Sequence, residues 1–237
     1  MTPILVPSRG VSDWQRLLAD PVKHWVRGRS AFELATSWES AVPSARGLPK
    51  EVGLVLDSIP ELRDCEVLIA IPEHKVDLDG GRRPSQTDLW ALLRSAHGLA
   101  SMAVEGKAGE PFDRPVSEWL SNASDRSGKP ERLKQLCGLL GLEESAVPAC
   151  RYQLLHRTAA AILEARRFGA SRAVMLVQSF TSDPESMAAY AHFGRLLGAE
   201  AGENAAIGCG SRGGVDLFIG WVSSPRSVAL REAFPIE

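Results

Sequence analysis

Two residues of opposite charge end an apolar run near the middle of the chain. Glu105 and Lys107 are separated only by Gly106. If the run is a β-strand, the two charged side chains project from the same face, because side chains alternate along a strand. A carboxylate and an ammonium group side by side can hold a metal ion and a water molecule together. The spacing therefore predicts a pair of candidate catalytic residues at the end of a strand.

A second carboxylate, Asp88, precedes Glu105 by 17 residues. It belongs to the segment 86–94, which is also strand-like, and a short glycine-containing turn leads from there into the strand 99–107. A hairpin of this kind brings Asp88, near the start of one strand, beside Glu105, near the end of the next. Carboxylates are hard oxygen ligands of the type that Mg²⁺ and Mn²⁺ prefer. The pattern predicts a divalent-metal hydrolytic site.

The elements that must position these residues form one α/β domain in our interpretation. Apolar runs and helical periodicity predict strands and helices along most of the chain. A meander of three strands followed by a crossover helix predicts a mixed central sheet that is flanked by helices on both faces. The glycine-rich stretch 208–214 is predicted to be a hairpin turn into the last strand. The predicted strands are 66–77, 86–94, 99–107, 173–180 and 215–222, and the main predicted helices are 30–41, 48–59, 130–140, 151–168 and 184–197.

Composition sets limits on the function. The chain has 237 residues, 44% of them hydrophobic, which supports a sizeable core in a single domain spanning 1–237. Its formal net charge of −2 neither indicates nor excludes nucleic acid as a partner. No apolar run reaches the ~20 residues that span a bilayer, and the first residues lack the features of a signal peptide. Four cysteines without metal-ligand spacing favour reduced thiols and a cytoplasmic protein.

With Asp88 on the second strand and Glu105-Gly106-Lys107 on the third, the chain resembles the PD-(D/E)XK nuclease superfamily over residues 30–180. The segments 104–112 and 151–159 are similar to a poorly characterised bacterial branch of that superfamily. One departure is that Thr87, rather than a proline, precedes the aspartate. The resemblance implies a restriction-endonuclease-like αβββαβ core, with an N-terminal helical segment at 1–29 and a C-terminal extension at 181–237.

The resemblance also implies roles for the motif. Asp88, Glu105 and the backbone carbonyl of Gly106 would hold Mg²⁺ or Mn²⁺, and Lys107 would orient or deprotonate the attacking water. Glu33, on the first core helix, would add a further metal ligand. The expected activity is that of a metal-dependent nuclease, a hydrolase of the endonuclease type, with DNA the favoured substrate.

The helix predicted from residue 151 carries the candidate substrate-binding residues. Gln153, His156 and Arg157 share one helix face, because residues three and four positions apart are neighbours. A glutamine at this place contacts the lysine or the phosphate in several branches of the superfamily, and the guanidinium of Arg157 can bind a phosphate through two hydrogen bonds. The alternative is a solvated polar stripe. Solvation is also the expected role of the charges at 73–75, which end the first strand.

Two other functions remain open from the sequence. A catalytically silent member of the fold would bind nucleic acid or a protein partner, which the nearly neutral charge favours. A metal-dependent hydrolase acting on another substrate class is neither supported nor excluded. The expected partner is nucleic acid and no membrane is expected, while a homodimer is compatible with everything observed.

Overall fold

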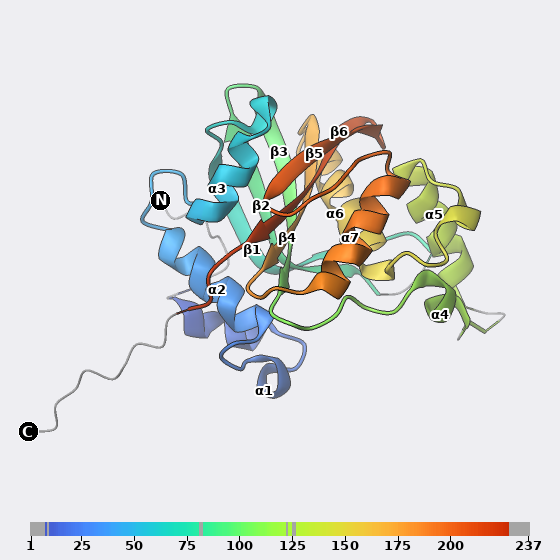
Figure 1. The fold of residues 1–237 in the computed structure, drawn as a ribbon, viewed down its shortest axis with the longest axis horizontal. Coiled ribbons are helices and arrows are strands. Elements are labelled where there is room, and N and C mark those ends of the chain that lie inside the picture. The colour runs from blue at the N-terminus through green and yellow to red at the C-terminus, as the bar shows by residue number, and fades with distance from the viewer. Residues whose placement is uncertain (1–7, 9, 81–82, 122, 125–126, 228–237) are drawn as a thin grey trace, which may run out of the picture.

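The computed structural model describes residues 8, 10–80, 83–121, 123–124 and 127–227. At its centre is a six-stranded sheet with the strand order β1-β2-β3-β4-β6-β5 (Figure 1). The pairs β3–β4 and β4–β6 are parallel, and the pairs β1–β2, β2–β3 and β5–β6 are antiparallel. The predicted α/β class with a mixed sheet is thus confirmed. The strands are β1 (Glu66–Val76), β2 (Ser85–Ser95), β3 (Gly98–Lys107), β4 (Arg172–Ser179), β5 (Ala205–Arg212) and β6 (Val215–Ser223).

Helices cover both faces of this sheet. Alternation along β3 shows the two sides: Met102 and Val104 pack in the core under α2 and α3, whereas Ala103 packs in the core with α5, α6 and α7. Figure 1 shows these two groups of helices on either side of the strands. The helices are α1 (Pro21–His24), α2 (Ser30–Ala41), α3 (Lys50–Asp57), α4 (Val116–Ser121), α5 (Lys129–Leu140), α6 (Tyr152–Arg167) and α7 (Pro184–Leu196), with short 3₁₀ helices at Val11–Leu17, Pro60–Leu62 and Glu144–Ala146.

The five predicted strands and five main helices are present with bounds that differ by at most two residues. The glycine-rich stretch 208–214 is the exception, because most of it belongs to β5 and only Gly213 and Gly214 form the turn. The strand was missed because its glycines hide the pattern. Gly210 has a left-handed backbone with φ 73°, and the register of β5 shifts between Gly208 and Ser211. Glycine adopts such a bulge without steric cost.

Parts of the two expected terminal segments, 1–7, residue 9 and 228–237, lie outside the described residues. Within the described ranges, no helix is both long and apolar enough to cross a membrane.

The helix α6 connects β3 to its parallel neighbour β4 and packs against both strands. Its apolar side, which includes Leu154, Leu155 and Ala159, is fully buried in the core. The first turns of α6 therefore lie beside the end of β3, where Glu105 and Lys107 are found. This placement brings the polar side of α6 to the candidate site.

Candidate active site

The site begins where β2 and β3 separate. The ladder of hydrogen bonds between them starts at the pair Leu89–Val104. Asp88, one residue before Leu89 on β2, is not paired with a residue of β3. Instead, the Asp88 carboxylate oxygen Oδ2 accepts a hydrogen bond of 2.8 Å from the backbone N–H of Gly106. This hydrogen bond takes the place of a backbone bond of the ladder. It holds the Asp88 side chain at the end of the hairpin where the two strands separate. This local separation of the strands makes room for the site.

Glu105, Lys107 and Gln153 form a closed triangle of side-chain contacts. The Lys107 ammonium lies 3.0 Å from Oε1 of Glu105 and donates to Oε1 of Gln153 at 3.2 Å. The Gln153 amide group donates back to Oε1 of Glu105 at 2.6 Å. The Lys107 ammonium also lies 4.6 Å from the ring centre of Phe112, a favourable position for a cation. Glu105 and Lys107 are both buried, so the ammonium group is held at a defined place.

Arg157 joins the two carboxylates. Its Nε donates to Oε2 of Glu105 at 2.7 Å, and its Nη2 lies 3.9 Å from Oδ1 of Asp88. Its Nη1 donates to the Ser85 hydroxyl at 3.3 Å. The two carboxylates are therefore close enough to share one cation. Arg157, which was predicted to bind phosphate, is buried and already engaged by these partners.

The charges around the two carboxylates separate their pKa values. Burial would raise the pKa of Glu105, but the positive charges of Lys107 and Arg157 hold it below its usual value. Burial raises the pKa of Asp88 to about 7, and the nearby negative charge of Glu105 adds to the rise. Glu105 is accordingly the ionised member of the pair at neutral pH, whereas Asp88 titrates near neutrality.

A third acid, Glu73, belongs to the site although it was expected to be solvated. It stands opposite Asp88 in the β1–β2 ladder, between the registered pairs Pro72–Leu89 and His74–Thr87. Burial raises its pKa to about 8, and the charge of Asp88 contributes to the rise.

Two details hold the Glu73 carboxylate in place. The Gln86 amide donates to its Oε2 at 2.6 Å, and the backbone of Glu73 is left-handed, with φ 53°. That conformation is costly for a residue other than glycine and is often found at functional sites. A run of charges after a strand was the only signal in the sequence, and the register that places Glu73 opposite Asp88 was not readable from it.

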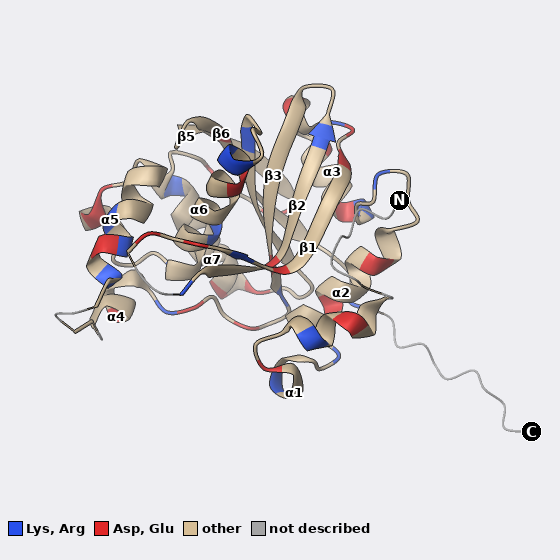
Figure 2. Ribbon diagram, turned by 180° about the vertical axis from the view of Figure 1, so that it is seen from behind, with Lys and Arg blue, Asp and Glu red and all other residues tan. Residues whose placement is uncertain are grey.

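The three acids, Gln153 and Arg157 border a cavity of about 390 Å³, and Lys107 contacts two of these residues without lining the cavity itself. Figure 2 shows acidic positions where the ends of β1, β2 and β3 meet. The cavity is also bordered by the segment before α2, including His24 and Arg29, which the sequence did not indicate. Its polar wall comprises Glu73, Asp88, Glu105, Glu110, Gln153 and Arg157.

Glu33 does not reach this cavity. Its Oε1 accepts hydrogen bonds from the Gly28 backbone at 2.9 Å and the Ser227 hydroxyl at 3.0 Å. Its Oε2 accepts from the Ser227 backbone at 2.6 Å. The expected contribution of Glu33 to the metal site is thus corrected, because its position on α2 directs the carboxylate to the segment before that helix and to the chain after β6. Glu110 instead lies at the cavity and accepts from the backbone N–H groups of Ser30 and Ala108.

His156 is also directed away from the cavity, in contrast to the predicted substrate contact. Its Nδ1 lies 2.8 Å from the Ser85 hydroxyl. Burial, together with the charges of Arg157 and Arg132, lowers its pKa well below the usual value, so the ring is neutral. Neighbouring positions on a helix differ by about 100° in direction, which explains why Arg157 reaches the carboxylates and His156 does not.

The two carboxylates at the cavity offer part of the ligand set that a divalent ion needs. No group of three His, Cys, Asp or Glu side chains suited to holding a metal occurs within the described residues. Asp88 and Glu105, however, already face a shared cation, the guanidinium of Arg157. Two carboxylates, a backbone carbonyl and water are a suitable hard-oxygen donor set for Mg²⁺. An ion bound there would replace contacts that Arg157 makes now.

Comparison with known proteins shows the family. The chain belongs to a family described as a domain of unknown function (DUF6946), whose family model matches residues 7–226. Searches of curated proteins and of solved structures found no match.

Proposed function

We propose that this protein is a Mg²⁺- or Mn²⁺-dependent nuclease of the PD-(D/E)XK type. The observation that carries the proposal is that Asp88, Glu105 and Gln153 converge at one cavity, while the buried Lys107 contacts both Glu105 and Gln153. Buried charges are expensive unless they are paired or serve a site, and here they are concentrated at one end of two strands. The order of three strands, the helix α6 and the strand β4 supports the same proposal.

Each of these groups has a role in the proposed reaction. Asp88, Glu105 and the carbonyl of Gly106 would hold the ion, which when bound polarises the phosphate and lowers the pKa of water. The Lys107 ammonium contacts Oε1 of Glu105. Gln153 contacts both the ammonium and that oxygen, and so holds Lys107 beside the carboxylate. From that position its ammonium group can orient the attacking water and stabilise the negative charge that develops on the phosphate.

The test is nicking of a supercoiled plasmid in Mn²⁺ by the wild type and by Lys107→Ala. We expect a rate loss of about 10²–10⁴-fold in the variant, because groups that serve the water or the transition state typically contribute that much. Lys75→Ala is the matched control, since Lys75 is an exposed lysine on β1. Thermal melts of both variants establish that they are folded. Equal nicking by wild type and Lys107→Ala would show that the lysine is structural.

A catalytically silent nucleic-acid-binding module is the second candidate. It is favoured by Arg157, which already neutralises charge on Glu105 and Asp88 without an ion. Wild-type protein that binds DNA or RNA but cleaves neither in Mg²⁺ or Mn²⁺ would support this function. For either function we propose a cytoplasmic location, because all four cysteines are buried free thiols.

A further inference from the structure

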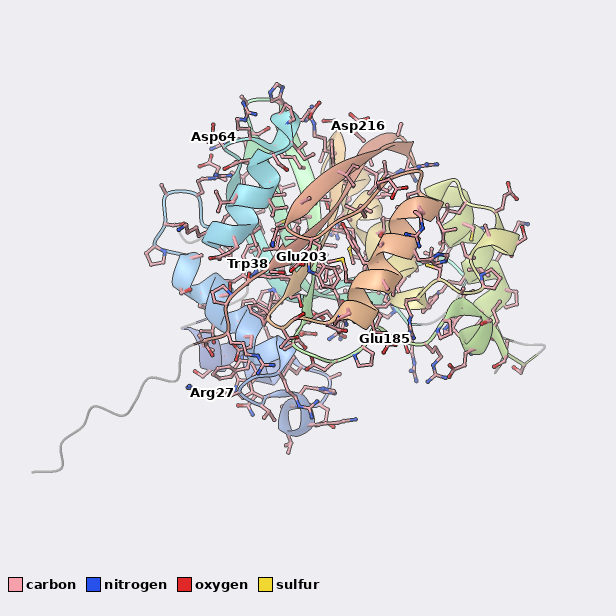
Figure 3. The ribbon with its side chains drawn as sticks, viewed as in Figure 1. Arg27, Trp38, Asp64, Glu185, Glu203 and Asp216 are labelled. Carbon is pink, nitrogen blue, oxygen red and sulfur yellow. The ribbon has the colours of Figure 1, made fainter. Side chains whose placement is uncertain are left out.

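The segment 20–29, which we call the α1 arm, contains α1 and leads into α2. It carries Lys23, Arg27 and Arg29 against one acid, Asp20, and thus has a formal charge of +3 − 1 = +2 in a chain whose net charge is −2. All three basic residues are exposed. Figure 1 shows α1 at the periphery of the molecule, away from the sheet, and Figure 3 shows Arg27 at this outer corner. The arm is a local positive surface on a nearly neutral protein.

The arm is built into the border of the candidate site. Arg29 and His24 line the same cavity as Asp88 and Glu105. The position of the arm is set by two anchors, one at each side of Arg29: the Gly28 backbone donates to Glu33, and the Ser30 backbone donates to Glu110.

The base of the arm is also packed. The rings of Trp25 and Phe32 lie 5.3 Å apart, and the Arg27 guanidinium lies 5.4 Å from the Phe32 ring centre. The arm is thus attached to α2, with Arg29 at the cavity and Arg27 further out on the same arm.

The basic groups of the arm make no ion pair with any residue that the structure describes. Other arginines of the protein do so, as in the pairs Arg46–Asp57, Arg94–Glu66 and Arg151–Glu185. Basic groups that pair with no acid among the described residues have a physical use on an arm that borders a cavity rich in carboxylates, since that cavity by itself repels a phosphate. Cations at its edge would attract the phosphates on either side of the one to be cleaved.

We propose that the α1 arm binds the sugar-phosphate backbone of the nucleic acid that the site cleaves. This inference rests on the proposed function and extends it by assigning the substrate-anchoring element. Val22 and Val26, with 87% and 45% of their surfaces exposed, lie among the basic residues and add apolar contacts to sugars or bases. The arm thus takes the substrate-binding role that the sequence assigned to His156 and Arg157.

The test measures binding without cleavage. Anisotropy of a fluorescent single-stranded DNA is recorded in EDTA, over a range of KCl concentrations, with the wild type and the triple variant Lys23→Ala, Arg27→Ala, Arg29→Ala. Removing three phosphate contacts should weaken binding at least tenfold at low salt. It should also reduce the slope of log affinity against log salt by about 2, because each contact to a single strand contributes about 0.7.

The matched control removes three exposed basic residues elsewhere, Arg63, Lys134 and Arg195. It should leave affinity and slope unchanged, apart from a small effect of net charge. Thermal melts check that both triple variants are folded.

The outcomes separate this inference from the proposed function. Loss of binding and a shallower slope in the arm variant alone support the arm. If the wild type nicks plasmid but the arm variant binds and nicks as well as the control, the arm is not the anchor and the nuclease proposal stands. If the wild type neither binds nor cleaves DNA or RNA, both proposals are overturned. Loss of DNA binding in both triple variants would indicate an effect of overall charge and would overturn the role proposed for the arm.

Discussion

Glu73 is a single side chain that makes the stability of the protein depend on pH. Its pKa is raised from its ordinary value to about 8, chiefly by burial. Below the ordinary pKa both the folded and the unfolded chain carry the proton. Between that value and about 8 only the folded chain retains it, so the stability of the folded state falls as pH rises through this window and levels off above it.

We therefore expect Glu73→Gln to melt at a higher temperature than the wild type at pH 9, and its melting temperature to change less between pH 5 and 9. An advantage of a few degrees is reasonable, since about 1 kcal/mol shifts melting by about 2–4 °C in a chain of this size. Thermal melts across this pH range measure it, with Glu51→Gln on α3 as the control. Asp88 keeps some pH dependence in the variant, because its pKa is also raised, to about 7. Parallel pH curves for wild type and Glu73→Gln would contradict the expectation.

Arg157 is a second single side chain on which stability depends, because its positive charge lies beside both carboxylates. Arg157→Gln leaves Glu105 and Asp88 without the guanidinium that lies 2.7 Å and 3.9 Å from them. Removing one partner of a buried ion pair typically costs about 3–5 kcal/mol, so the variant should melt well below the wild type. Because the guanidinium then no longer competes with an ion for the carboxylates, added Mn²⁺ should raise its melting temperature more than that of the wild type.

Melting curves with and without Mn²⁺ test this, with Arg167→Gln as the control from the exposed side of α6. A smaller response to Mn²⁺ in Arg157→Gln than in the wild type would mean that the arginine supports the ion rather than competing with it.

At the scale of an element, the strands β2 and β3 separate at the open end of their hairpin. Gly106 lies at this separation, and the structure allows a side chain there: an added Cβ would lie 3.5 Å from Oδ2 of Asp88 and from Ser30, an ordinary contact distance. Glycine at this position is thus not required by crowding within the protein itself. We expect Gly106→Ala to change stability by no more than about 1 kcal/mol, a shift of about 2–4 °C.

Gly80→Ala provides the contrast for the same melting experiment. Its Cβ would lie 2.3 Å from the backbone nitrogen of Arg132, and its backbone is left-handed with φ 73°, so a large loss of stability follows. If Gly106→Ala melts as low as Gly80→Ala, the strand ends are packed more tightly than the contacts indicate. If Gly106→Ala is stable but nicks slowly, the space beside Gly106 is used by the ion or the substrate.

The helix α6 shows how one element serves both packing and chemistry. Its apolar side fills the core, and Gln153 and Arg157, four positions apart on its polar side, both contact Glu105. Periodicity predicted this helix, because its apolar residues recur at helical spacing. The predicted contact of Gln153 with Lys107 is present in the structure. The partner of Arg157 was not predictable, since it depends on how deeply the helix lies against the sheet.

At the scale of the whole molecule, patterns of local period determined most of the fold. Alternation placed Glu105 and Lys107 on one face of a strand, and runs of apolar residues located nearly every strand and helix. The strand β5 was not predicted, because glycines have no side chain to show a pattern. The class of fold followed from the order of the elements.

The remaining features were decided only by the tertiary structure. Strand register placed Glu73 opposite Asp88, and long-range contacts directed Glu33 to Ser227 and the α1 arm to the edge of the cavity. A sequence reveals the period of a segment because neighbouring residues determine it. Which acid faces which cavity depends instead on residues that are distant in the chain and meet only when the sheet and its helices have packed.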